Sequence, residues 1–176
     1  LNYTYDGFLP LTETWSGPIT GTVEKSYNSD FQTKGINVNG TNVAFTYDND
    51  GLLTKAGGLT IARDTQNGLL TGTTLGPTTT SQSYNGFGEP AHFTAMQSST
   101  ALYDVQYRRN LLGRITQIIE VLGGQTQVRD YEYDTAGRLV TVTADGVVQS
   151  SYGYDSNGNR LARTTSQGTV NDSYDA

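Results

Sequence analysis

The sequence predicts an all-β protein in which tandem β-hairpins form one curved antiparallel sheet. A tyrosine-aspartate motif recurs along the chain at a spacing of about 20 residues, which is within the range typical of repeat arrays. The composition combines 12 Tyr with 21 Gly in 176 residues, so strand-forming side chains alternate with turn residues. Short β-branched runs bounded by Gly, Asn and Asp are typical of hairpins.

The clearest copies of the motif lie in the second half of the chain. One reads YEYDTAGRL over 131–139 and the other reads YGYDSNGNRL over 152–161. The step from Tyr133 to Tyr154 is about 21 residues and that from Tyr154 to Tyr174 is about 20. No catalytic, cofactor-binding or metal-binding residue is expected, and the residues with a structural role in the motif are Tyr5, Asp6, Tyr47, Asp48, Gly51, Tyr107, Gly113, Arg114, Tyr131, Tyr133, Asp134, Gly137, Arg138, Tyr152, Tyr154, Asp155, Gly158, Arg160, Tyr174 and Asp175.

Residues 1–176 are interpreted as a single array of about eight repeats, because weaker copies fill the gaps between the clear ones. The repeats over 103–176 match the motif better, and those over 1–102 are degenerate. Weaker copies include Tyr27-Asn28, Arg63-Asp64 and Tyr84-Asn85. Both ends of the sequence fall inside a repeat, so we expect a truncated piece of a longer array.

One repeat is expected to form a hairpin and a connecting turn. The β-branched run 138–143 and the run 147–154 flank Asp145-Gly146, a pair that favours a tight hairpin turn. A second turn follows over 155–158, where the Asp155 carboxylate can accept bonds from backbone N–H groups two or three residues on. Gly158 supplies the positive φ that this turn requires. Similar hairpin tips are expected at Asn39-Gly40, Gly57-Gly58, Gly123-Gly124 and Gln167-Gly168.

The tyrosines are expected on one face of the sheet, because side chains two residues apart on a strand share a face. Rings of successive repeats would then stack into an aromatic stripe, with polar residues such as Asp130, Glu132, Gln149 and Ser151 on the opposite face. Right-handed strand twist would curve this sheet into an open or one-turn β-shell or solenoid. The segment 111–122 has some helical spacing of apolar residues, but Gly113 and its β-branched content favour a strand.

Charge and composition exclude several classes of function. A formal net charge of -6, with 11 basic residues spread thinly, argues against nucleic acid or an anionic membrane as partner. The absence of cysteine removes disulfides and thiol chemistry. No stretch approaches the roughly 20 apolar residues of a membrane span, and no signal peptide is recognisable, so an export signal is expected outside this segment.

The motif strings at 131–139 and 152–161 resemble the YD repeats of Rhs proteins, which also occur in toxin-complex C components, teneurins and bacterial wall-associated proteins. The resemblance implies a hollow spiral β-shell that encloses a toxin in bacterial members or serves as a surface scaffold in teneurins. It implies a secreted or cell-surface location, bacterial by family, with neighbouring repeats and an enclosed toxin domain as partners. The self-cleaving Rhs core segment and a toxin domain are not recognisable, so neither activity is expected of this chain.

The sequence gives weaker support for catalysis or calcium binding. His92 has no Ser or Cys partner motif nearby, and triads need three convergent groups. The strings at 48–51 and 155–159 resemble half of a calcium loop but lack the closing Glu, since Leu59 and Ser166 stand in twelfth place. The basic residues Arg108, Arg109 and Arg114 are expected to partner Asp side chains.

The first functional hypothesis is therefore a non-catalytic shell or scaffold module that encapsulates a toxin or other cargo, without cofactors. The alternative is a carbohydrate-binding or adhesion module, with glycans stacking on the tyrosines. A glycosidase ranks last, because the acidic residues belong mostly to the repeat and no unrepeated carboxylate pair stands out. Exposed sheet edges favour edge-to-edge pairing between copies of the chain.

Overall fold

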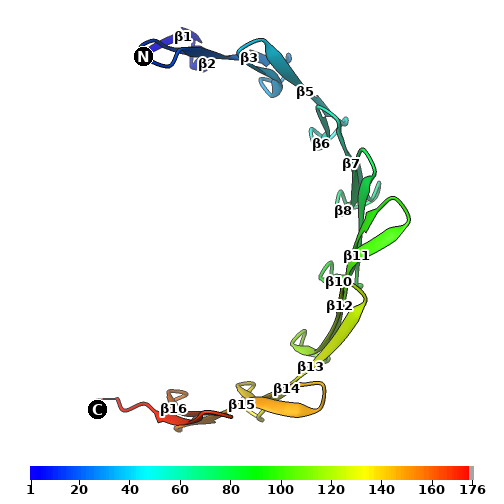
Figure 1. Cartoon of the computed structure of the whole chain (residues 1–176), viewed down its shortest axis with the longest axis vertical. Coiled ribbons are helices and arrows are strands. Elements are labelled where there is room, and N and C mark those ends of the chain that lie inside the picture. Colours follow the sequence, from blue (N-terminus) through cyan, green and yellow to red (C-terminus); the bar gives the residue numbers. More distant parts are fainter. Residues whose placement is uncertain (175–176) are drawn as a thin grey trace. The chain divides into compact units, whose positions relative to one another are not determined.

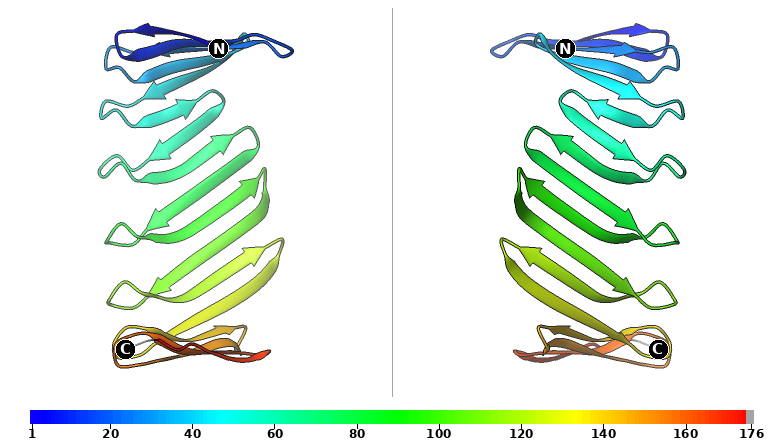
Figure 2. Two further views of the ribbon diagram at one scale, coloured as in Figure 1. Left: turned by 90° about the vertical axis from the view of Figure 1, so that its left-hand side faces the viewer. Right: turned by 90° about the vertical axis from the view of Figure 1, so that its right-hand side faces the viewer.

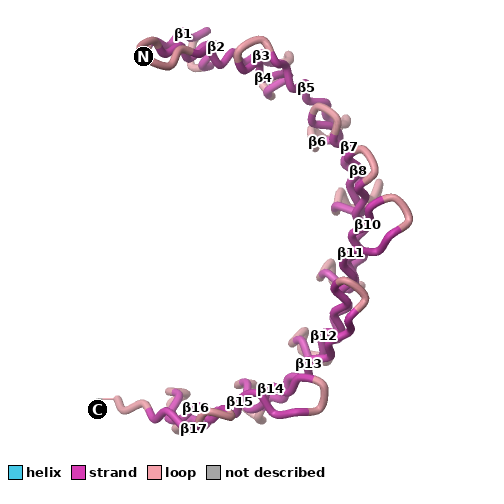
Figure 3. The backbone as a smooth tube through the Cα atoms, in the orientation of Figure 1, coloured by secondary structure: helices cyan, strands magenta, loops and turns pink. Residues whose placement is uncertain are grey.

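The computed structural model describes residues 1–174, and their regular secondary structure is entirely β (Figure 3). The prediction of an all-β chain is confirmed, and the segment 111–122, which has some helical spacing, forms a turn over 111–114 followed by a strand over Ile115–Leu122. The 17 strands are β1 (Asn2–Asp6), β2 (Leu9–Trp15), β3 (Gly21–Tyr27), β4 (Thr33–Val38), β5 (Thr41–Tyr47), β6 (Leu53–Ala56), β7 (Leu59–Arg63), β8 (Leu70–Leu75), β9 (Thr78–Tyr84), β10 (Pro90–Gln97), β11 (Thr100–Arg109), β12 (Ile115–Leu122), β13 (Gln125–Tyr133), β14 (Leu139–Ala144), β15 (Val147–Tyr154), β16 (Arg160–Thr165) and β17 (Gly168–Asn171).

The strands follow one another as an antiparallel meander (Figure 1). The chain divides into two compact units, the first over Leu1–Thr79 and the second from Thr80 onward. Within each unit the strands succeed one another in chain order, and their connections alternate between the two edges of the ribbon (Figure 2). In the described residues β1 pairs only with β2 and β17 only with β16, so the antiparallel sheet is not closed.

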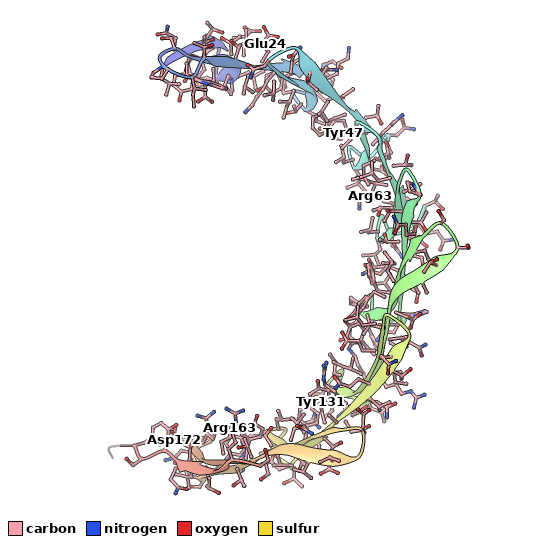
Figure 4. All side chains as sticks on the ribbon, viewed as in Figure 1. Glu24, Tyr47, Arg63, Tyr131, Arg163 and Asp172 are labelled. Atoms are coloured by element: carbon pink, nitrogen blue, oxygen red, sulfur yellow. The ribbon has the colours of Figure 1, made fainter. Side chains whose placement is uncertain are left out.

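Each unit is a single layer of sheet, with side chains projecting from both faces (Figure 4). Among residues 1–174, Val105 is the one buried hydrophobic side chain, at 3% exposure, and Ser150 is the one buried polar side chain. Without a packed core, most of the order must come from backbone ladders and from contacts between side chains of neighbouring strands. No helix in the described residues is long and apolar enough to cross a membrane.

One edge of each unit carries tight hairpin turns. Asp145 and Gly146 have φ values of 50° and 78° and join Ala144 directly to Val147, as a type I′ turn does. Asn39 and Gly40 form the same turn between β4 and β5. The hairpin predicted around Asp145-Gly146 is therefore confirmed, together with the tip at Asn39-Gly40.

The opposite edge carries longer turns, each beside a β-bulge. The register shifts between Glu132 and Tyr133 in the β13–β14 pair, and between Gly153 and Tyr154 in the β15–β16 pair. Equivalent shifts occur in the first unit, for example at Thr46/Tyr47. The extra residue lies on the strand after the turn, as Val140 does on β14 and Leu161 does on β16, so the strand before the turn keeps its alternation of side chains.

Candidate functional site

The longer turns repeat one hydrogen-bond pattern, in which an Asp or Asn side chain closes the loop; we call them Asx turns. In the Asp155 turn, Oδ1 accepts bonds from the backbone N–H groups of Asn157 at 2.9 Å and Asn159 at 2.8 Å. The acceptor therefore usually serves residues two and four positions on, not two and three as predicted from the sequence. Asn can begin such a turn in place of Asp, because one side-chain oxygen is enough to accept these backbone bonds. The turns begin at Asn28, Asp48, Asp64, Asn85, Asn110, Asp134 and Asp155.

Glycine in these turns meets two separate requirements. Gly137 has a φ of 85°, and a Cβ there would lie 2.6 Å from Nη1 of Arg114, which belongs to the preceding turn. Gly51 has a φ of 77°, and its Cβ would lie 2.9 Å from Nε2 of Gln32. Phe31 occupies the same position with a φ of 61°, so the left-handed backbone can be held by another residue at a cost.

The residue directly before each Asx residue, which we call the anchor residue, connects one turn to the preceding turn. The Tyr154 hydroxyl donates to the Leu139 carbonyl oxygen at 2.8 Å, and the Tyr133 hydroxyl donates to that of Ile115 at 2.7 Å. The last residue pair of β12 and β13 toward the turn is Gln117–Asp130. The Ile115 carbonyl therefore lies beyond the end of the β12–β13 ladder. The anchor hydroxyl satisfies an acceptor that the ladder leaves open. In the first unit the same bonds join Tyr27 to Pro10 and Tyr47 to Thr33.

Two arginines, Arg63 and Arg109, occupy the anchor position. Their equivalence to the anchor tyrosines was not predicted from the sequence. Arg63 donates from Nε to the Leu53 carbonyl oxygen at 3.2 Å, and Arg109 donates from Nη1 to that of Pro90 at 2.7 Å. Figure 4 shows Tyr47 and Arg63 on the same side of the ribbon. Tyr107 lies two residues before Arg109, so it corresponds to the first tyrosine of the motif. The position directly before the Asp or Asn of each turn could have identified these residues in the sequence. A long side chain that carries a hydrogen-bond donor, whether Tyr or Arg, reaches the backbone carbonyl of the preceding turn from there.

The expected stripe of ring-on-ring stacking is wrong for the clearest repeats. The guanidinium of Arg114 lies 4.8 Å from the centre of the Tyr133 ring, and that of Arg138 lies 4.9 Å from the centre of the Tyr154 ring. These cation–π contacts put a cation from the preceding turn against each ring. The ring contacts found among tyrosines of the motif are within one strand, between Tyr3 and Tyr5 at 6.4 Å.

Arg138 ties its own turn to the next one. Its Nε lies 2.7 Å from Oδ2 of Asp134, and its Nη1 donates to the Asp155 carbonyl oxygen at 2.7 Å. The bond from the Arg138 backbone N–H, followed by the contact with its guanidinium, lowers the pKa of the Asp134 carboxyl. The Asn159 side-chain amide does the same for the pKa of Asp155, which it contacts at 2.9 Å.

The remaining predicted motif residues are placed as follows. Arg160 lies one position later than Arg138 in its repeat, on β16, and its Nε lies 3.0 Å from Oδ2 of Asp172. Gly113 has a φ of 78° in the Asn110 turn, and Tyr152 accepts a bond from the Ser150 hydroxyl at 3.0 Å. Asp6 ends β1, Tyr131 is on β13 and Tyr174 is exposed. Asp175 lies outside the described residues.

The prediction that basic residues 108, 109 and 114 partner Asp side chains is wrong for two of them. Arg109 Nε lies 3.5 Å from Oε2 of Glu89, and Arg114 stacks on Tyr133 with its buried Nε unpaired in the described part of the chain. The turns beside these two arginines are closed by Asn85 and Asn110, which offer no carboxylate. The arginines therefore contact a glutamate, a carbonyl and a ring.

The two sheet faces differ in chemistry. On one face Tyr103 donates to Glu120 Oε1 at 2.7 Å, and Arg129 Nη1 lies 3.2 Å from Glu120 Oε2. This hydrogen bond, helped by desolvation, raises the pKa of Tyr103 to about 12. On the other face His92 Nε2 lies 2.8 Å from Asp104 Oδ2, a pair that no third group joins in the described residues.

No group of three or more His, Asp or Glu side chains within residues 1–174 could hold a metal ion. At the calcium-like string over 48–51, Asp48 Oδ1 accepts bonds from the backbone N–H groups of Asp50 at 3.0 Å and Leu52 at 2.8 Å. That oxygen is therefore already used to close the turn. The geometry at the Asx turns is structural and repeats from turn to turn, whereas a catalytic centre is normally built once.

Comparisons with known proteins agree with this architecture. Two similar solved structures are described as crystal structures of TcdB2-TccC3-TEV and of TcdB2-TccC3. The first has a TM-score of 0.69 at 14% identity and covers 90% of this chain and 11% of that chain. The second has a TM-score of 0.67 at 15% identity and covers 88% of this chain and 10% of that one. No curated protein matches the chain.

At these identities the similarity shows the fold alone, and this chain spans about a tenth of the chains that it matches. A family model is more specific. The model described as Teneurin YD-shell matches residues 1–176, the whole chain. With its Asx turns, anchor residues and one-layer antiparallel sheet, this chain belongs to the Teneurin YD-shell family.

Proposed function

We propose that this chain is a wall segment of a YD shell, a non-catalytic module that encloses a cargo such as a toxin domain. The observation that carries the proposal is the single layer of sheet with one uncovered apolar face. In the first unit Val23 pairs with Val38 and Ile36 pairs with Val43, which places these side chains on a common face. An exposed apolar surface of this kind is typical of a site that binds another protein segment.

The opposite face is polar and has little to offer an apolar partner. Its cross-strand contacts join hydroxyl groups, as between Thr4 and Thr12 at 2.6 Å and between Ser81 and Thr94 at 2.8 Å. A wall with one apolar and one hydrated face suits a shell whose apolar side is turned to the cargo. We infer an extracellular setting, secreted or at a cell surface, from the family and from the toxin-complex structures that share the fold.

The test uses neighbouring residues of β14 that point to opposite faces. Val142 pairs with Tyr131 and Thr141 pairs with Glu132, so the two side chains lie on different faces. In a cargo-loaded parent polypeptide without other reactive thiols, we expect Val142→Cys to resist a bulky maleimide and Thr141→Cys to react. Removing the cargo should expose the Val142 variant. Equal labelling of both variants in the loaded parent would disprove enclosure on this face.

A glycan-binding module is the second candidate, and one observation favours it. Tyr3, Tyr5 and Phe8 surround a hollow of about 360 Å³ that Glu13 and Lys25 also line. The three rings are 48%, 59% and 103% exposed, so a sugar ring could stack on them. Binding on a glycan array that is lost in Tyr5→Ala but kept in Tyr131→Ala would support this candidate, and no binding would exclude it.

A further inference from the structure

In four of the Asx turns, the side chains at the first and fifth positions contact each other through a donor and an acceptor. In the Asp134 turn, Nε of Arg138 lies 2.7 Å from Oδ2 of Asp134. In the Asn85 turn, Nδ2 of Asn85 donates to Oε2 of Glu89 at 2.7 Å. The two further contacts join Asn28 to Gln32 and Asp155 to Asn159. The first and fifth residues of these turns are therefore complementary.

The Asn110 turn lacks this complementarity. Oδ1 of Asn110 accepts bonds from the backbone N–H groups of Leu112 at 3.0 Å and Arg114 at 3.1 Å, so the amide Nδ2 is the group left for a side-chain contact. Nδ2 is a donor, and the guanidinium of Arg114, the fifth residue, also carries only donors. Two donors therefore occupy the positions at which a donor and an acceptor meet in the other four turns.

Arg114 is the unsatisfied member of two equivalent arginines. Arg114 and Arg138 each stack on the anchor tyrosine of the next turn. Arg138 also donates to a carboxylate and to a backbone carbonyl, whereas Arg114 makes no hydrogen bond or ion pair within residues 1–174. Its Nε is buried without a partner, which costs free energy. Its two terminal nitrogens are not buried, so an acceptor can reach the guanidinium from solvent.

The carboxylates of the preceding and following turns are already engaged. Glu89 contacts the side chains of Asn85 and Arg109. Asp134 closes the following turn and contacts the fifth residue of that turn. A negatively charged acceptor for Arg114 therefore has to come from another molecule or from a segment outside the described residues.

From this mismatch we infer a carboxylate-binding site at Asn110 and Arg114. The planar guanidinium can hold both oxygens of a carboxylate, and the Asn110 amide adds an uncharged donor beside it. Partial burial against the Tyr133 ring lowers the local dielectric, which strengthens a bond between opposite charges. The ligand is either a small free carboxylate or an Asp or Glu side chain of a bound protein segment, and the same donors serve both.

The site lies on the face that we assign to cargo. Tyr133 shares a face with Tyr131 because the two residues alternate along β13, and Tyr131 pairs with Val142. An acidic side chain of an enclosed segment can therefore approach Arg114 from this face. That source of the carboxylate rests on the proposed function, whereas binding of a free carboxylate does not.

The first test titrates the isolated 176-residue chain with acetate at constant ionic strength. The Nε–H resonances of the arginines are followed by NMR, and Arg114→Lys assigns one of them by removing it. The Arg114 resonance should shift and reach saturation. That of Arg138 should stay in place, because its Nε already contacts Asp134. Absence of a saturable shift at Arg114, or an equal shift at Arg138, would overturn the inference.

A variant of the turn tests the mismatch directly. Asn110→Asp builds the ion pair that Asp134 forms with Arg138, so it should weaken acetate binding by about tenfold. Asn49→Asp adds the same charge at an exposed side chain that makes no hydrogen bond in the described part of the chain, and it should bind acetate normally. Undiminished binding in the Asn110 variant would contradict the site. Circular dichroism shows whether each variant keeps its sheet, and the titration of the unmodified chain needs no variant.

The second test identifies the source of the carboxylate in a cargo-loaded parent polypeptide. Phenylglyoxal modifies accessible guanidinium groups, and peptide mass spectrometry locates them. Arg163 is the reference for simple coverage, because it lies on the same face and has no partner within residues 1–174. Protection of Arg114 beyond that of Arg163, lost when the cargo is removed, would identify a cargo carboxylate. Equal reactivity of the two would identify a free carboxylate as the ligand. Failure of cargo enclosure would leave the acetate result unchanged, so the two proposals are tested separately.

Discussion

The Tyr154 hydroxyl donates to the Leu139 carbonyl oxygen at 2.8 Å, across a gap that backbone pairing leaves open. Residues of β14 and β15 pair from Ala144–Val147 to Thr141–Ser151 and no further toward the Asx turn. The anchor side chain therefore completes the contact between consecutive hairpins at the edge where the ladder stops. Side chains hold this edge of the sheet, whereas tight turns such as the type I′ turn at Asp145-Gly146 connect the strands at the other edge.

Removing one anchor hydroxyl should weaken the fold measurably. Tyr133→Phe keeps the ring under Arg114 but leaves the half-buried Ile115 carbonyl without its donor. We expect a loss of about 1 kcal/mol in the free energy of unfolding, measured by urea denaturation. Tyr5→Phe is the control, because the Tyr5 hydroxyl has no partner in the described residues and its loss should change stability little. A similar loss in both variants would contradict the role of the anchor bond.

Glycine at the turn should be required for two separable reasons. Gly158→Ala should cost about 1 to 2 kcal/mol, since φ is 91° there but nothing lies within 4 Å of the added methyl group. Gly137→Ala should cost more, because its methyl group would also meet Arg114 Nη1 at 2.6 Å. Thermal unfolding of both variants compares the two costs. The excess at position 137 should disappear when Arg114→Ala is added, and an excess that persists would place its origin elsewhere.

Acid should weaken the Asp134 turn. The folded-state pKa of Asp134 is lowered from its ordinary 3.8 by the bond from the Arg138 backbone N–H and then by the Arg138 side chain. A lowered pKa stabilises the fold fully above the unfolded value, and this contribution is lost as pH falls through the folded value. Asp134→Asn should therefore be less stable at pH 7 and lose less stability on acidification below about pH 4.

The control for the acid experiment removes a carboxylate that closes no turn. Asp30→Asn changes the net charge equally, and the Asp30 side chain accepts no hydrogen bond in the described residues. Urea denaturation at a series of pH values should give this variant the same acid dependence as the unmodified chain. A flattened profile in the Asp30 variant would assign the effect to net charge and not to the turn.

The Tyr103 hydroxyl should report on the hydrogen-bond network that it forms with Glu120, which also contacts Arg129. Its pKa is about 12, mainly because it donates to Glu120 Oε1, while the nearby Arg129 lowers it. Glu120→Gln should bring the pKa down toward the ordinary 10.0, and Arg129→Gln should raise it further. Difference titration of phenolate absorbance against Tyr103→Phe isolates this group from the other tyrosines. Shifts of the same sign in both variants would contradict the network.

Local features of the fold were predictable because they depend on residues close together in sequence. The Asp145-Gly146 tip, the strand over 115–122 and the turn at Asp155 follow from turn chemistry and from the alternation of strands. The spacing of the motif then indicates that the same antiparallel hairpin recurs along the chain. Of the candidate site, the Tyr-Asp and Gly positions could be named from the sequence, since the same string recurs.

The sequence by itself determined the family, the hairpin repeat and the division into an apolar and a polar face. Only the tertiary structure decided that Arg63 and Arg109 replace tyrosine as anchor residues, that Arg114 and Arg138 stack on the rings, and which carbonyl each anchor reaches. These anchor bonds join residues 10 to 19 positions apart on different hairpins. Their geometry depends on the bulges and on the point at which each ladder ends, and neither is encoded in a local string of residues.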